Sequence, residues 1–211
     1  MKNCLITGGG SKFGSKITEQ LVQVGYHVYL LTGSQQVADP NITVISVDWH
    51  ELKLQDLRRI ISNLPNLDLI FFNHNASALS KEKFNQNQMQ SFKDWQQSYF
   101  VASQFPFYLI HSLTNKISTT TKIGWMLSEL ISNPVATQVG YADYIGNKFT
   151  NGCIMKSFAQ SFPATFFGIN PESVGNNADV SKAIDIVKLI EHTADLNGKI
   201  YYPNGTIFNF G

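Results

Sequence analysis

The sequence predicts a doubly wound α/β fold, in which a seven-stranded parallel sheet is flanked by helices. Apolar runs of strand length alternate with segments of helical spacing along the whole chain. Most of the apolar runs are continuous, which is typical of strands buried on both faces of a parallel sheet. No repeat, low-complexity tract or linker interrupts this order, so residues 1–211 are predicted to form a single domain.

The strands are expected at 2–7, 28–31, 42–47, 67–72, 122–127, 165–169 and 199–202, and the helices at 13–24, 52–64, 89–117, 140–162 and 179–193. Pro106 is expected to bend the third helix, and Asp179 to lie near the cap of the fifth. The apolar residues 207–210 are expected to be tucked into the protein or into a partner. Because ligands bind beyond the carboxyl ends of parallel strands, the site is predicted at that edge of the sheet.

The first predicted strand runs into a glycine-rich turn, and a predicted helix follows. Backbone N–H groups at the start of a helix point outward and carry partial positive charge, and glycines let a phosphate approach closely. The turn is therefore predicted to hold the phosphates of a dinucleotide. The residues assigned to it are Gly8, Gly10, Ser11, Lys12, Phe13 and Gly14.

Tyr144 and Lys148 are four residues apart in a predicted helix, so they share one face. A phenol titrates near ~10 unaided, and a cation within ~4–6 Å favours the phenolate. The two side chains are thus candidates for an acid/base unit. The alternative is a solvated helix face without chemistry, since this spacing often arises by chance.

Polar residues also follow the fourth and fifth predicted strands. Ser128 lies sixteen positions before Tyr144 (144 − 128) and has a hydroxyl that can bond a substrate oxygen; the alternative is a serine that caps a turn. Asn75 and Ala76 are candidates for a cofactor floor. His74 is a candidate general base, although a lone histidine at a strand end is more often structural.

Composition and charge exclude several classes of function. The net charge is +1 and the only arginines are Arg58 and Arg59, which speaks against nucleic acid and anionic membranes as partners. No apolar run approaches the ~20 residues of a membrane span, and no secretion signal is evident, so a cytoplasmic protein with reduced Cys4 and Cys153 is predicted. No metal site is expected, because no ligand cluster with a known spacing occurs.

Together these motifs resemble the short-chain dehydrogenase/reductase family, nearly from end to end. Residues 7–14 look like the T-G-x-x-x-G-x-G cofactor turn of that family, residues 75–77 are similar to its N-A-G motif, and residues 197–200 to its closing strand. The order and spacing of the motifs are jointly specific, although each is weak alone. The other positions that match functional residues of the family are Asp48, Ser128, Tyr144, Lys148 and Pro171.

The resemblance implies a single-domain Rossmann fold and NAD(P)(H)-dependent interconversion of a carbonyl and an alcohol by hydride transfer. Tyr144 would protonate the developing alkoxide, or deprotonate the alcohol in the reverse direction. Ser128 would orient and polarise the oxygen. Lys148 would lower the pKa of the tyrosine and hold the nicotinamide ribose.

The sequence departs from the family at several positions. Lys12 replaces the middle glycine of the turn, so either its Cβ crowds the turn or its ammonium reaches a phosphate. Ala102 stands where the family usually has an asparagine that supports a proton-relay water, and Glu172 replaces a glycine. The connection at 174–179 is short for a substrate lid, which implies an open cleft, a bulky or carrier-bound substrate, or a lid from another chain.

The second predicted strand is followed by residues 31–35, which include no acid. An acid there would accept hydrogen bonds from the adenosine ribose and repel a 2′-phosphate. The hydroxyls of Thr32 and Ser34, with the charge of Lys12, instead favour NADP(H) over NAD(H).

Two functions compete. The first is a short-chain oxidoreductase that acts on a small or carrier-bound carbonyl or alcohol; the second is a catalytically weak or inactive dinucleotide-binding protein with a sensing or assembly role. A sugar-nucleotide epimerase is disfavoured, because too little chain follows the sixth strand. The resemblance also implies a homodimer or homotetramer that pairs the two long helices, in which aromatic residues serve the interface or fill the core; these are Trp95, Tyr99, Phe105 and Phe149.

Overall fold

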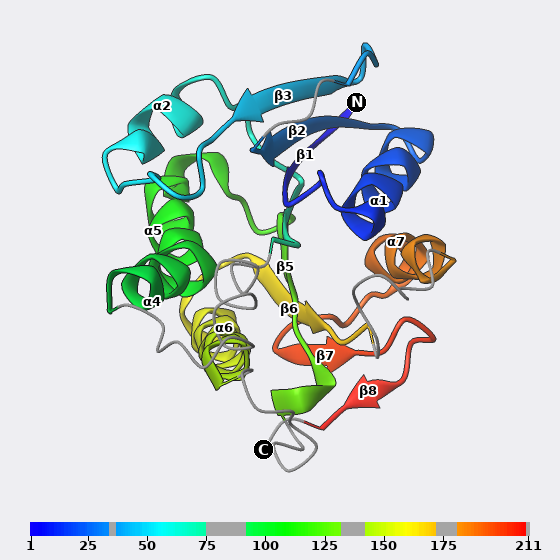
Figure 1. Cartoon of the computed structure of the whole chain (residues 1–211). Coiled ribbons are helices and arrows are strands. Elements are labelled where there is room, and N and C mark those ends of the chain that lie inside the picture. The colour runs from blue at the N-terminus through cyan, green and yellow to red at the C-terminus, as the bar shows by residue number, and fades with distance from the viewer. Residues whose placement is uncertain (34–36, 75–91, 132–141, 172–180, 210–211) are drawn as a thin grey trace.

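The computed structural model describes residues 1–33, 37–74, 92–131, 142–171 and 181–209 (Figure 1). Their eight strands form one sheet in the order β3-β2-β1-β4-β5-β6-β7-β8. The chain moves outward from β1 to β3 and then returns to β4 on the other side of β1, which makes the β1/β4 boundary the switch point of the sheet. The strands are β1 (Lys2–Thr7), β2 (Tyr26–Thr32), β3 (Ile42–Ser46), β4 (Leu69–Phe72), β5 (Lys122–Met126), β6 (Thr165–Ile169), β7 (Lys199–Tyr201) and β8 (Ile207–Phe208).

The sheet has one strand more than the seven predicted, and it is not wholly parallel. β1 to β7 are parallel, whereas β8 pairs antiparallel with β7, with Phe208 opposite Ile200. Phe208 is buried and Ile207 is half exposed, so the apolar tail is tucked into the protein itself through one of these two residues. A strand of two residues carries no periodicity, which is why the pattern did not predict it.

Helices cover both faces of the sheet (Figure 1). α1 (Lys12–Gln23) and α7 (Lys182–His192) pack together on one face, and their apolar sides form one core with β1, β2 and β4. α2 (Asp56–Ser62), α5 (Phe105–Ser112) and α6 (Ala142–Ser161) form the second core on the opposite face. α7 begins after Ser181, and the predicted cap at Asp179 lies outside the described residues.

The long helix predicted at 89–117 is divided into several pieces. α4 (Phe92–Tyr99) passes into a π-helical turn, η2 (Phe100–Gln104), and then into α5; a short 3-10 turn, η3 (Thr114–Lys116), follows. Pro106 lies in the first turn of α5, directly behind η2, and it has no N–H to donate to that preceding turn. The irregularity lies in η2, directly before Pro106, in the turn whose carbonyl would otherwise accept from residue 106.

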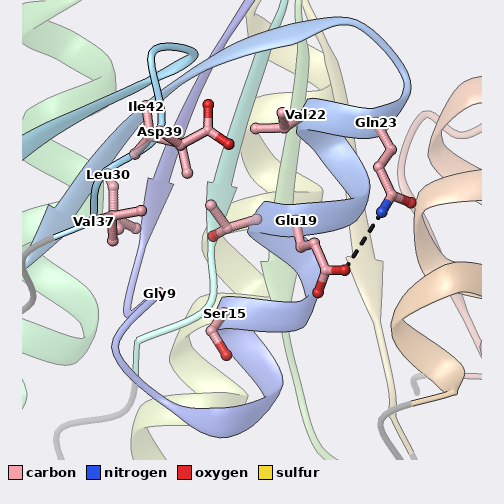
Figure 2. Close-up of a pocket in the computed structure, with 10 residues that line it drawn as sticks. Gly9, Ser15, Glu19, Val22, Gln23, Leu30, Val37, Asp39 and Ile42 are labelled. Carbon is pink, nitrogen blue, oxygen red and sulfur yellow. Dashed lines mark hydrogen bonds between the residues drawn. The ribbon is translucent and has the colours of Figure 1, made fainter.

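The connection between β2 and β3 spans only 33–41, and its described residues contain no helix. A crossover between parallel strands usually takes a dozen or more residues and carries a helix. This part of the sheet face is therefore thinly covered, and no residue of β3 is fully buried. A groove of about 300 Å³ remains between α1 and β2 (Figure 2). Its lining is Gly9, Ser15, Thr18, Glu19, Val22, Gln23, Leu30, Val37, Asp39 and Ile42.

Candidate active site

The glycine turn after β1 is closed tightly against the end of β4. Gly8 has a φ of 70°, in the left-handed region that favours glycine. A Cβ on Gly8 would lie 2.6 Å from the Cα of His74, and a Cβ on Gly14 would lie 2.3 Å from the carbonyl oxygen of Gly8. Side chains at these two positions would therefore collide with backbone, which gives a physical reason for both glycines.

Behind the turn, α1 begins with a complete N-cap. The Ser11 Oγ accepts a hydrogen bond from the Gly14 N–H at 2.9 Å. The helix geometry leaves the N–H groups of Lys12 and Phe13 without acceptors inside α1, and its first turn contains no acid. Partial positive charge thus gathers at a turn into which backbone can approach closely, and the residues present fit the phosphates of a dinucleotide.

The place of Lys12 excludes one of the two effects expected of it, the crowding of the glycine turn. Lys12 is the first residue of α1 and is exposed, so its Cβ does not crowd the turn. Contact of its ammonium with a phosphate stays a prediction. The Phe13 side chain is buried in the core beneath α1, which leaves only its backbone N–H for a ligand.

Tyr144 and Lys148 lie one helical turn apart on a buried face of α6. Each residue is only 6% exposed. The Lys148 Nζ lies 5.7 Å from the centroid of the Tyr144 ring and donates a hydrogen bond to the carbonyl oxygen of Met126 at 2.6 Å. Met126 is the last residue of β5, so the pair lies against the carboxyl end of that strand. The solvated helix face, the alternative for this pair, is therefore excluded.

Burial has a chemical consequence for the lysine. It lowers the pKa of Lys148 from its ordinary 10.5 to about 8, because the charged form loses hydration. The group remains mostly protonated at neutral pH, yet its pKa is close enough to that pH for proton exchange. A cation of this kind beside a buried phenol is suited to proton transfer.

Ser128 lies two residues beyond β5 and is 8% exposed. Its Oγ accepts a hydrogen bond from the Leu130 N–H at 3.3 Å, which is the turn-capping role considered as its alternative. A hydroxyl that accepts one bond still has its own O–H to donate. Ser128 and the Lys148 contact at Met126 thus belong to the same strand end.

The sequence matches no family model and no curated protein. Its structure matches solved proteins over nearly its whole length. A carbonyl reductase from Pseudomonas aeruginosa PAO1 superposes with a TM-score of 0.77 at 16% identity, covering 99% of both chains. A short-chain dehydrogenase/reductase from Burkholderia multivorans with bound NADP gives 0.78 at 15% identity, covering 98% of both chains. The chain has the short-chain dehydrogenase/reductase fold. A short chain dehydrogenase from Escherichia coli CFT073 gives 0.78 at 17% identity, covering 96% of this chain and 95% of the other.

The other residues predicted to bind the cofactor differ in position and burial within this short-chain dehydrogenase/reductase fold. Thr32 ends β2 and is almost fully buried, and Pro171 is buried just beyond β6. Asp48 is exposed beyond β3, where its Oδ1 accepts a hydrogen bond from the His50 N–H at 2.9 Å. Gly10 is exposed beside the turn. Their cofactor contacts stay predictions, and the predicted residues outside the described ranges are Ser34, Asn75 and Ala76.

His74 has the contacts of a structural residue rather than those of a free base. Its Nδ1 lies 2.6 Å from the Thr7 Oγ1, and its Nε2 lies 2.8 Å from the carbonyl oxygen of Val101. Its ring stacks on Trp49, with 5.2 Å between the ring centroids. Burial lowers the pKa of His74 from 6.5 to about 4, outweighing the bond to Val101. No sequence pattern singled out Trp49, because only the fold brings it to this strand end.

Two buried asparagines of α6 near the candidate site were also not indicated by any sequence motif. Asn147 and Asn151 flank Lys148 on the same helix, and each is at least as buried as the lysine. Polar residues at this spacing, on a helix face that must meet the sheet, were the signal that could have found them. Their contacts connect α6 to the π-helical turn.

Neither Tyr144 nor Lys148 is among the residues that line the groove of Figure 2. Its lining includes the carboxylates of Glu19 and Asp39, which disfavour an anionic ligand there. None of the described helices combines the length and apolar character needed to cross a bilayer. Within the described ranges, no three His, Cys, Asp or Glu side chains gather as a metal site.

The aromatic residues expected at an interface divide into two groups. Phe105 is fully buried and fills the core, whereas Trp95 is 46% and Phe149 is 50% exposed. Tyr99 stacks on Trp95 with 5.9 Å between the ring centroids. Exposed Trp95 lies on α4 and exposed Phe149 lies on α6, the two helices expected to meet a second copy.

Proposed function

We propose that the protein is an NADP(H)-dependent oxidoreductase of the short-chain dehydrogenase/reductase family, which interconverts a carbonyl and an alcohol. The observation that carries the proposal is the buried pair of Tyr144 and Lys148 against the end of β5, in a chain with this fold. An ammonium is costly to bury, and beside a buried phenol its charge would favour the phenolate that proton transfer requires. Two structural neighbours, a carbonyl reductase and a short-chain dehydrogenase/reductase with bound NADP, support the same reaction class.

The residues of this chain would divide the work as follows. The turn at Gly8 and the first N–H groups of α1 would hold the phosphates, and the dinucleotide would supply the hydride chemistry. The Tyr144 hydroxyl would give its proton to the carbonyl oxygen and take it back in the reverse direction. The Lys148 ammonium would stabilise the phenolate that remains, and the Ser128 O–H would bond the reacting oxygen.

The preference for NADP(H) rests on charge. Lys12 is exposed at the start of α1, and the first turn of that helix contains no acid. A 2′-phosphate on the adenosine ribose would therefore meet a cation rather than a carboxylate. NADPH and NADH binding by Lys12→Gln tests this choice.

Replacement of Tyr144 by Phe tests the mechanism. Turnover with a panel of carbonyl substrates should fall by about 10²- to 10⁴-fold, the usual contribution of a positioned acid/base group, while NADPH binding measured by fluorescence is kept. Tyr108→Phe is the matched control, because Tyr108 lies exposed on α5, and it should leave turnover unchanged. Unchanged turnover in Tyr144→Phe would overturn the proposed mechanism.

The same titration separates the enzyme from an inactive nucleotide-binding protein. Ala102 motivates that alternative, since its side chain cannot bond a water. Tight NADPH binding without turnover of any carbonyl or alcohol in the panel would favour the binding protein. Failure to bind either NADPH or NADH would contradict both functions.

We further propose that the chain forms a homodimer or homotetramer through α4 and α6, acts on a small or carrier-bound substrate, and is cytoplasmic. Exposed Trp95 and Phe149 support the assembly. Phe149→Asp should shift the sedimentation of an oligomer toward the monomer. Equal sedimentation of this variant and the unchanged protein would argue against an interface there.

A further inference from the structure

The π-helical turn η2 and Pro106 together leave two consecutive carbonyls, those of Val101 and Ala102, without their usual donors. The Phe105 N–H donates to the carbonyl oxygen of Phe100, five residues back. In an α-helix the Val101 carbonyl would accept from the N–H of residue 105, and the Ala102 carbonyl from the N–H of residue 106, which here is a proline. In a continued π-helix Pro106 would serve Val101. Because proline has no N–H, neither arrangement supplies both carbonyls.

Side chains from two other elements donate to these carbonyls. The His74 Nε2 lies 2.8 Å from the Val101 oxygen, and the Asn151 Nδ2 donates to the Ala102 oxygen at 3.1 Å. Val101 and Ala102 are both buried, and an unpaired carbonyl in such a place would be destabilising. The π-helical turn is thus held from one side by the end of β4 and from the other by α6.

The bond network assigns the proton on His74. A carbonyl oxygen only accepts, so the Nε2 must carry the proton and the Nδ1 must accept from the Thr7 hydroxyl at 2.6 Å. The same hydroxyl accepts from the His74 N–H at 3.4 Å. One neutral imidazole therefore connects the end of β1, the end of β4 and η2, directly beneath Gly8.

On its other side, η2 is bonded to the helix face that carries Lys148. The Ser103 Oγ donates to the carbonyl oxygen of Asn147 at 3.4 Å, and Asn151 reaches Ala102. Asn147 precedes Lys148 by one residue and Asn151 follows it by three. A shift of η2 would therefore be felt on both sides of the lysine.

We propose that His74 is a positioning residue, which fixes η2 between the glycine turn and α6 and so sets the place of Lys148 and Tyr144 relative to the bound nucleotide. The effect of His74 on catalysis rests on the proposed function. Its role in fixing η2 does not depend on that function. His74 itself would touch neither substrate nor reacting atoms. It would act through Val101 and the helix packed behind it.

The structural part is tested first on the unchanged protein by ¹⁵N NMR of its histidine rings. The His74 ring should be in the Nε2–H form at pH 7 and remain neutral until the pH approaches about 4. Exposed His50 provides the reference signal in the same spectrum. An Nδ1–H form, or a ring already protonated at pH 6, would overturn the proposal without reference to any substrate.

The functional part is tested with two variants of His74. His74→Phe keeps a ring to stack on Trp49 but loses the bonds to Thr7 and Val101. Its kcat should fall by roughly 10²-fold, the usual effect of a misplacement near 1 Å, and His74→Gln should recover much of it because its amide can donate to Val101. In the same Phe variant the pKa of Lys148, followed with ¹⁵N-labelled lysine, should rise from about 8 toward 10.5 as water gains access.

Tyr26→Phe is the matched control. It removes a hydrogen bond to Glu191 at 2.6 Å on the opposite face of the sheet, and it should leave both kcat and the Lys148 titration unchanged. Equal Lys148 titrations in His74→Phe and the unchanged protein would overturn the positioning role. If the unchanged protein reduced no carbonyl, the proposed function would fail, while the histidine and lysine titrations would still decide this proposal.

Discussion

Two junctions at the carboxyl edge of the sheet are built in opposite ways. At the glycine turn the cap of α1 is a local contact, the Gly14 N–H bond to Ser11 across three residues. At η2 they are long-range, because His74 and Val101 are 27 residues apart and Ala102 and Asn151 are 49 apart. Contacts between residues close in sequence can be predicted from the sequence motif itself. Contacts between distant residues form only when the chain has folded.

Gly8 belongs to both junctions, so its substitution should have the largest effect. Gly8→Ala would place a Cβ at positive φ and against the backbone of His74, and should lower the free energy of unfolding by roughly 3 kcal/mol or more. Gly25→Ala is the matched control, since Gly25 has a φ of 92° with open space around its Cβ. It should cost only the conformational strain, about 1–2 kcal/mol. Equal losses in urea unfolding would mean that the contact with His74 contributes nothing.

The local junctions were the part that could be predicted from the sequence. The strand at Thr165–Ile169 was predicted with its observed bounds, because its apolar run is bounded by turn residues. The spacing of Tyr144 and Lys148 likewise required only one helix. β8 is too short to show a period, and η2 depends on Pro106 together with donors far along the chain. These features could not be read from neighbouring residues.

The η2 junction should also be visible in the pH dependence of stability. The unfolded chain protonates His74 near pH 6.5, whereas the folded chain does so only near 4. Between these values the unfolded state binds more protons, so stability falls as the pH falls through this window. The loss is at most about 3 kcal/mol, fully reached below about pH 4.

Urea unfolding of His74→Phe across the same pH range provides the comparison. The variant lacks the titrating group, so its stability should fall less steeply between pH 6.5 and 4, while the carboxylates contribute equally to both proteins. Parallel curves would contradict a depressed pKa for His74. They would also mean that the η2 junction does not contribute to the pH dependence of stability through His74.

The cap of α1 should give a smaller, purely local effect. Ser11→Ala removes the acceptor of the Gly14 N–H and should cost about 1 kcal/mol. Ser15→Ala, one turn later, removes only an exposed bond to the carbonyl oxygen of Lys12 and replaces serine by a better helix former. It should be neutral or slightly stabilising, so the two serines should change the urea midpoint in different ways. A loss of the same size in both would argue against the cap.

Lys12 carries the smallest expected effect and concerns the ligand alone. Lys12→Gln should weaken NADPH binding by roughly 5-fold, the value of about 1 kcal/mol for an exposed charge pair, and should barely alter NADH binding. Lys16→Gln is the control on the same helix, since its ammonium pairs with Glu19 at 2.8 Å. The NADPH effect should shrink at high salt, because an exposed pair is screened. Equal losses for NADPH and NADH would show that Lys12 does not distinguish the 2′-phosphate, and the choice of cofactor would then depend on residues beyond β2.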